Sequence, residues 1–284
     1  HLGDGPLATR VRDRHARHTV EWVERVDRGM EDAGGEDGLL AIDRELPELR
    51  TALAWLLERG DVDLAGRMVG ALAQYTWLRM RTDVARWSHD VVAADPGGRG
   101  SHTPVACTVG AVSAWLRGDV AGAQRCNDQA RQIARAAGVE VPGRVAHWDG
   151  TVALFTGRLD DAMRHYRVAR EADRDHVGHR VTTLGTEVLA LAYAGDAAAA
   201  GAHAQAMLDE IGERRGPHAA FGWYCAGEAE LNRDLDRARE RFGRAVEIAD
   251  ATGCAFVNGV AGTSDASIDL RRGDVVLAAG RNRS

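Results

Sequence analysis

The chain has 284 residues, of which 45% are apolar, so it is long enough to bury a sizeable hydrophobic core. All 36 basic residues are arginine, which excludes every chemistry that needs a lysine, including a Walker A phosphate loop and a Schiff base. The net charge is −6, and arginine is mixed with acidic residues, as in segment 158–175. This mixture is typical of solvated helix faces and argues against direct nucleic-acid binding.

The first 95 residues are predicted to form a helical segment of their own. Apolar residues recur at helical spacing over residues 8–30, which favours one helix. A glycine-rich break at 31–38 follows, and residues 39–87 then read as three helices, with Pro47 at the start of a helix or at a kink. The polar start does not resemble a signal peptide and no apolar run is long enough for a membrane span, so we expect a cytoplasmic protein.

A repeated pattern occupies the second predicted region, residues 96–284, and its first phase begins near residue 80. Each copy has an apolar end, a short break at Gly or Asn-Arg, an acidic residue and then an alanine. These alanines lie 38 to 40 residues apart, at Ala85, Ala123, Ala162, Ala200, Ala238 and Ala278. A fixed period of this length is the signature of a repeat architecture.

Each period contains two helical stretches. After the break, small residues recur seven positions apart, as at Ala123 and Ala130, so they share one helix face that can approach a neighbour closely. Between the pairs, Gly ends one helix and Pro, Asp, Ser or Thr opens the next. No run alternates with the period of a strand. The sequence therefore predicts an all-α fold, a right-handed α-solenoid of antiparallel helical hairpins with a period of 38 to 40 residues.

The tripeptide Arg-Gly-Asp occurs three times, at 59–61, 117–119 and 272–274. In an extracellular protein, an exposed copy would be a candidate adhesion ligand. The other repeats carry Thr-Gly-Arg, Ala-Gly-Asp or Asn-Arg-Asp at the same position. Glycine permits the positive φ that ends a helix, and aspartate caps the start of the next one. We therefore interpret the tripeptide as a structural turn.

This pattern resembles the tetratricopeptide repeat family over residues 80–284. The period here is longer than that family's unit of about 34 residues, and the aromatic positions are weaker. The resemblance implies a stack of hairpins whose first helices line a concave binding surface.

A second resemblance covers residues 10–95. The segments RDRHARHTVEWVERV, IDRELPELRTALAWLLERGDVDLAGRMVGAL and WLRMRTDVARW are similar to the junction between the winged-helix module and the helical repeats in large actinobacterial STAND-type ATPase regulators. Those regulators include LuxR-type and antibiotic-regulatory-type activators. The resemblance implies that this chain is the sensor part of a longer transcriptional regulator, with its ATPase and DNA-binding modules outside the sequence, and that it contacts neither nucleic acid nor membrane.

Seven residues are candidates for the surface that binds a protein, a peptide or a small effector. Counting from the shared alanine in the tetratricopeptide pattern places on the concave side Trp115, Arg144, His147, Thr151, Trp223, Glu230 and Thr263. Repeat proteins bind through broad surfaces, so for each residue alone a packing or solvated position is the more frequent outcome.

Two other functions are alternatives to a sensor domain. The first is a free-standing repeat scaffold for protein assembly. The second is a metal-dependent enzyme built on His176 and His179, three residues apart, with Asp173, but further ligands at metal-site spacing are not evident. We expect no enzymatic activity, no cofactor and no metal, and we expect reduced, buried thiols at Cys107, Cys126, Cys225 and Cys254.

Overall fold

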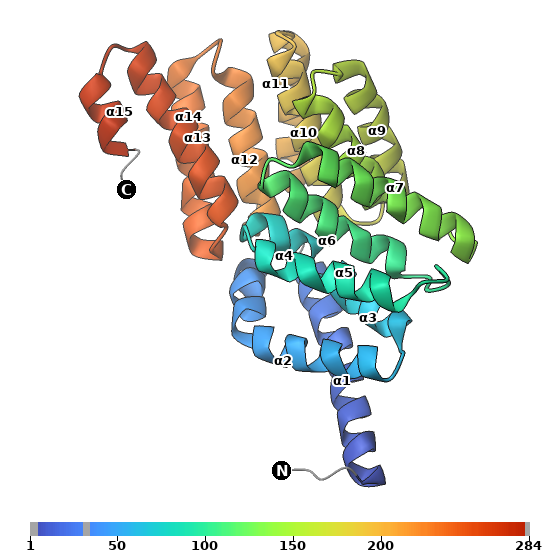
Figure 1. Ribbon diagram of the computed structural model, residues 1–284. Helices are drawn as coiled ribbons and strands as arrows, with labels where there is room; N and C mark the ends of the chain where they lie inside the picture. Colours follow the sequence, from blue (N-terminus) through green and yellow to red (C-terminus); the bar gives the residue numbers. More distant parts are fainter. Residues whose placement is uncertain (1–4, 31–34, 282–284) are drawn as a thin grey trace. The chain divides into compact units, whose positions relative to one another are not determined.

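The computed structural model describes residues 5–30 and 35–281, and all regular structure in these two ranges is helical (Figure 1). The described residues form two compact units: the first combines positions up to 29 with 40–152, and the second combines 30–39 with positions from 153 onward. The all-α prediction is confirmed.

The first unit is built from helices that pack around α6. Its elements are α1 (Pro6–Gly29), most of α2 (Gly38–Glu58), α3 (Val62–Gly70), α4 (Ala73–Leu78), the 3-10 turn η2 (Thr82–Val84), α5 (Ala85–Ala94), α6 (Thr103–Leu116), α7 (Val120–Ala137) and the larger part of α8 (Gly143–Phe155). Helix α6 packs against α3, α4, α5 and α7. It is buried from Ala106 to Ala114, and its small residues let four neighbours approach it.

One detail of the first unit differs from the prediction, and a second excludes one of two predicted alternatives. Residues 39–87 do not form three helices, because the chain breaks between α3 and α4, where the Ala71 N–H still bonds to the Arg67 carbonyl but Leu72 leaves helical geometry. Pro47 lies inside α2 and does not open a helix. The hydroxyl of Thr51 donates to the Pro47 carbonyl at 3.0 Å.

The second unit continues the series of hairpins. Its elements are the 3-10 turn η1 (Gly35–Asp37), the end of α8, α9 (Leu159–Ala172), α10 (Val177–Tyr193), α11 (Ala197–Ile211), α12 (Pro217–Glu230), α13 (Leu235–Thr252), α14 (Ala255–Arg271) and α15 (Val275–Arg281). Helix α10 packs against α9, α11 and α12. Every residue from 181 to 190 is buried, so α10 is the centre of this unit.

The shared alanines are buried. None is more than 7% exposed: the six positions are Ala85, Ala123, Ala162, Ala200, Ala238 and Ala278. The residue seven positions after Ala123, Ala162, Ala200 or Ala238 is fully buried as well, for example Ala130 and Ala169. The predicted sequence period therefore coincides with the recurrence of buried alanines.

Each Arg-Gly-Asp tripeptide forms the turn inside a helical hairpin. At the second copy, Gly118 has φ 76°, its N–H bonds to the Trp115 carbonyl at 2.8 Å, and the Asp119 N–H bonds to the Ala114 carbonyl at 2.9 Å. This is the Schellman pattern of a helix C-terminus. The Asp119 carboxylate then accepts from the Gly122 N–H at 2.7 Å and caps α7. The structural interpretation of the tripeptide is confirmed.

The same turn recurs along the chain. Glycines with φ between 71° and 83° stand five residues before the buried alanine at Gly60, Gly118, Gly157, Gly195 and Gly273. Aspartate caps the following helix in the other two copies of the tripeptide, where Asp61 accepts from the Leu64 N–H and Asp274 from the Leu277 N–H. Met80 occupies the glycine position before Ala85 and takes the same left-handed conformation, with φ 55°.

Replacing Gly118 by alanine is expected to lower the free energy of unfolding by about 1 kcal/mol, because a Cβ is disfavoured at positive φ. Space is not the reason, since an added Cβ would meet no atom within 4 Å. Gly243 is the matched control: it is exposed inside α13 with equally free space, so alanine there is expected to raise stability by about 0.5–1 kcal/mol. Chemical denaturation measures both, and equal effects of the two substitutions would contradict the turn argument.

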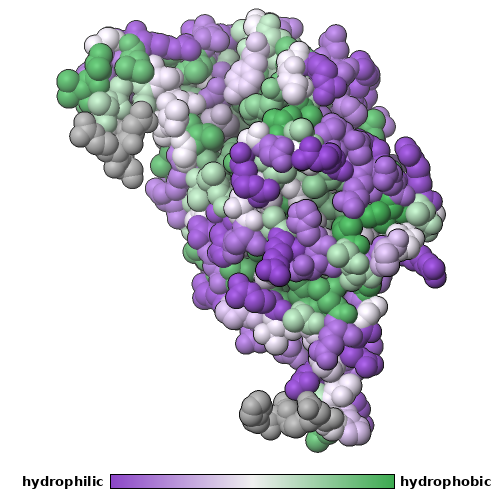
Figure 2. Space-filling model, viewed as in Figure 1, coloured by the Kyte–Doolittle hydropathy of each residue, from purple (hydrophilic) through white to green (hydrophobic). Residues whose placement is uncertain are grey.

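Helix α15 leaves an apolar surface uncovered. Val275, Val276 and Leu277 are 65%, 82% and 53% exposed. Figure 2 shows the hydrophobic side chains over α15, near the C-terminal end of the chain. Hairpins inside a repeat array bury such a surface against the next hairpin.

Candidate functional site

The rings of Trp115 and His147 both contact Trp148 in the first unit. Trp115 ends α6, and its ring centroid is 5.5 Å from that of Trp148 on α8. The His147 ring contacts Trp148 edge-on at the same centroid distance of 5.5 Å. Trp148 is 6% exposed, whereas Trp115 and His147 are half-buried. Two of the seven predicted residues therefore form one aromatic patch on the first helices of consecutive hairpins.

Arg144 is fixed inside the first unit and is not open to a ligand. One guanidinium nitrogen donates to the Gly70 carbonyl at the end of α3, at 2.8 Å, and the other terminal nitrogen lies 2.9 Å from the Asp27 carboxylate on α1. The two charged side chains are 16% and 10% exposed. Thr151 is also buried, at 3%, and its hydroxyl donates to the His147 carbonyl. Arg144 thus joins α8 to α1 and α3, whereas the Thr151 bond stays within α8.

The three remaining predicted residues lie in the second unit. Trp223 is half-buried on α12. Glu230, at the end of the same helix, is 4% exposed and its carboxylate lies 3.3 Å from Arg241. Burial lowers the pKa of Arg241, and Glu230 opposes that shift. Thr263 is exposed on α14, where its hydroxyl donates to the Gly259 carbonyl at 2.8 Å. Of these three residues, Trp223 and Thr263 have side-chain surface that a partner would reach, and Glu230 does not.

A groove on α9 escaped the sequence analysis. Its volume is about 520 Å³, and it is lined by Arg167, Arg170, Glu171 and Arg174. One of these residues, Arg170, has its guanidinium 3.2 Å from the buried carboxylate of Glu187 on α10. Residues three and four apart on a helix share a face, so the spacing of Arg167, Arg170 and Glu171 was a signal that the sequence offered.

A second buried carboxylate lies between α12 and α14. Ser264 donates a hydrogen bond to Glu228, which is 9% exposed. Burial raises the pKa of Glu228, and this hydrogen bond only partly opposes the shift. Glu228 therefore stays uncharged over more of the pH range than a free glutamate side chain would.

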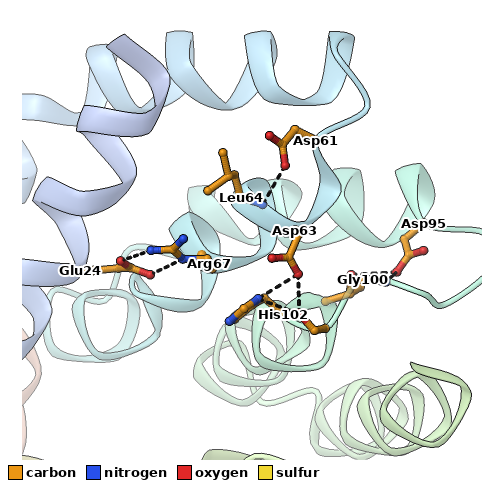
Figure 3. Close-up of polar contacts among 10 residues, drawn as sticks. Glu24, Asp61, Asp63, Leu64, Arg67, Asp95, Gly100 and His102 are labelled. Carbon is orange, nitrogen blue, oxygen red and sulfur yellow. Dashed lines mark hydrogen bonds and ion pairs between the residues drawn. The ribbon is translucent and has the colours of Figure 1, made fainter. Parts of the chain in front are cut away.

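Two carboxylates, those of Asp95 and Asp63, accept hydrogen bonds from the loop at 95–102 before α6. Figure 3 shows Asp95 accepting from the Gly100 N–H, at 3.0 Å, and Asp63 accepting from His102. Ser101 and His102 both point at the same oxygen of Asp63, at 2.6 and 2.9 Å, so they do not form the serine–histidine–aspartate relay of a hydrolase. Burial would raise the pKa of Asp63, but the hydrogen bonds from Ser101 and His102 outweigh it and the pKa is lowered.

The residues of the alternative metal site lie close together without forming a ligand set. The rings of His176 and His179 are 5.3 Å apart, and His179 Nδ1 is 3.5 Å from the Asp173 carboxylate. Within 5–30 and 35–281, no group of three or more His, Cys, Asp or Glu side chains is arranged to hold a metal ion. All four cysteines are free thiols, and burial raises the pKa of Cys107 to about 12. None of the described helices has the length and hydropathy needed to span a bilayer.

Comparison with known proteins supports the fold. No protein-family model and no curated protein matches the chain. Among solved structures, the apo form of RapI is similar with a TM-score of 0.51 at 12% identity, over 94% of this chain and 74% of RapI. The APC/C hetero-tetramer Cut9–Hcn1 is similar with a TM-score of 0.51 at 17% identity, over 86% of this chain but only 46% of the matched chain. Both are tetratricopeptide-like helical-repeat proteins, and this chain has the same class of fold.

Proposed function

We propose that the chain is a non-enzymatic, tetratricopeptide-like interaction module that binds a protein or peptide partner in the cytoplasm. The observation that carries the proposal is the half-buried pair Trp115 and His147, packed around Trp148 on the first helices of two successive hairpins. Half-buried tryptophan is enriched in binding hot spots because it presents a large rigid apolar surface with a polar N–H.

The proposal is tested by comparing three forms of the chain in affinity capture from extracts of the source organism. Trp115→Ala is expected to lower recovery of the specific partner by about fivefold or more, as for a moderate hot spot. Trp22→Ala is the matched control, because Trp22 is also half-buried but lies on α1. A partner lost equally in both variants, or in neither, would argue against binding at this patch.

We further propose that the module is the sensor part of a STAND-type ATPase regulator of transcription. Support comes from the resemblance of residues 10–95 to the winged-helix and repeat junction of such regulators. We expect the native gene to continue upstream of residue 1 into a nucleotide-binding module. A start codon directly before this segment would instead favour a free-standing scaffold.

A further inference from the structure

The groove on α9 combines a ligand-sized volume with a strong positive charge. Its volume of about 520 Å³ falls in the range of roughly 300–1,000 Å³ that is usual for small-molecule sites. Three arginines and one glutamate, Glu171, line the groove, so its lining is positively charged in a protein whose net charge is −6. In Figure 2 the surface is hydrophilic where α9 lies in Figure 1. The groove therefore favours an anion over a cation or an apolar ligand.

Two of its arginines are available. Arg167 and Arg174 are exposed, and their guanidinium groups form no hydrogen bond or ion pair within the described chain. The backbone of Arg174 is held in place, because Arg180 donates to its carbonyl and also to Glu210, at 2.7 Å. Arginine binds carboxylate and phosphate oxygens in bidentate fashion, so two such groups can hold a ligand with more than one oxyanion.

The third arginine, Arg170, pairs with a buried carboxylate, Glu187, whose burial does not by itself stabilise the fold. The Glu187 side chain is 2% exposed, and one of its oxygens has no hydrogen bond in the part of the chain that the structure describes. Its other oxygen lies 3.2 Å from Arg170, which is 37% exposed. Replacing a buried ion pair by apolar residues is often neutral or stabilising, so a half-satisfied carboxylate at this depth points to a use in binding.

The charge of Glu187 depends on Arg170. Burial raises the pKa of Glu187, and Arg170 is the strongest opposing influence, followed by His203 on α11 and then Arg167. From α12, which also packs on α10, His218 faces Thr182 at 3.1 Å. A ligand that draws Arg170 away therefore removes the main reason for Glu187 to stay ionised.

We propose that the α9 groove binds a small molecule with two or more carboxylate or phosphate groups. On binding, the Arg170 guanidinium leaves the Glu187 carboxylate and pairs with an oxyanion of the ligand. Glu187 then takes a proton from solvent. The O–H bond of the Glu187 carboxyl is the only covalent bond formed.

Isothermal titration of the full chain at low ionic strength, with pyrophosphate and with citrate as probes, tests the site. We expect saturable binding of at least one probe, and the tighter one identifies phosphate or carboxylate as the preferred group. Arg167→Glu combined with Arg174→Glu is expected to weaken it by at least about tenfold. The charge-matched control is Arg14→Glu with Arg25→Glu, two exposed residues on α1, which is expected to stay within about twofold. Equal loss in both double variants, or no saturable binding, overturns the proposal.

The exchange has its own readout. Glu187→Gln removes the internal competitor and is expected to bind the probe more tightly than the natural protein at about pH 8. This advantage is expected to shrink as the pH is lowered, because protonating the natural Glu187 on binding then costs less. The ratio of the affinities of the Glu187→Gln variant and the natural protein, taken at one pH, is unaffected by titration of the probe, because both proteins meet the same probe. His203→Gln is expected to preserve the pH dependence of the ratio, whereas a ratio of one at every pH would exclude the exchange.

Discussion

Replacing Arg144 by alanine is expected to lower the free energy of unfolding by about 3–5 kcal/mol, because it leaves the Asp27 carboxylate buried without its partner. Asp27 is 8% exposed, and its second oxygen makes no hydrogen bond among the described residues. The substitution also removes the 2.8 Å donor to the Gly70 carbonyl. Chemical denaturation followed by circular dichroism gives the change directly.

Two controls separate the ion pair from arginine in general. Arg14→Ala on the exposed side of α1 is expected to change stability by no more than about 0.5 kcal/mol. The double substitution Arg144→Met with Asp27→Leu is expected to recover most of the loss, since it removes both charges and keeps the volume. If Arg144→Ala is as stable as the natural protein, Arg144 is free for the ligand role that the repeat pattern predicted.

Phe242→Ala is expected to cost about 3–5 kcal/mol, the usual range for deleting a buried aromatic ring. Phe242 is fully buried on α13, with its ring centroid 6.1 Å from that of Tyr224 on α12. An added Cβ at Gly227 would lie 2.4 Å from the Phe242 ring, so the glycine is what lets the ring fit. The loss is measured by the same denaturation experiment.

The fit between Phe242 and Gly227 predicts a compensating pair. Gly227→Ala alone is expected to destabilise by about 1–3 kcal/mol through overpacking. Combined with Phe242→Leu, which shortens the clashing side chain, it is expected to cost clearly less than the sum of the two single changes. Additive effects would show that the backbone relaxes and that the ring does not set the helix spacing.

The repeat could be predicted from sequence because its determinants are local. A positive-φ glycine, a capping aspartate and a small residue five positions after the glycine lie within a few residues of one another, as at Gly118, Asp119 and Ala123. The break between α3 and α4 has a tertiary component. Cβ atoms at Gly66 and Gly70 would come within 2.8 Å of His102 and 2.6 Å of Val105, so close packing on the start of α6 shapes this region.

The candidate site was predicted only in part for a similar reason. Counting along the repeat named Trp115 and His147, whose rings the structure places against Trp148, and their role in binding stays a prediction. It misplaced Arg144, because its partner Asp27 is 117 residues away in the sequence and outside the period. The charged face of α9 can be read from residue spacing, but the contact between Arg170 and Glu187 on the next helix cannot. The sequence boundary at residue 95 stays a prediction, since the compact units divide at 152 and 153.

The uniform hairpin turns also bear on how such a chain changes length over evolution. The backbone enters and leaves the turns at Gly118, Gly157 and Gly195 with nearly the same φ, 76°, 75° and 82°. Unequal recombination between the corresponding codons would therefore insert or delete one whole hairpin and rejoin the helices in register. The longest step, 40 residues from Ala238 to Ala278, contains the longest pair of helices, α13 and α14, so the small differences in period lie in the helices as well as in the loops. The tripeptide that looks like an adhesion signal therefore marks a position at which whole hairpins can be inserted or deleted.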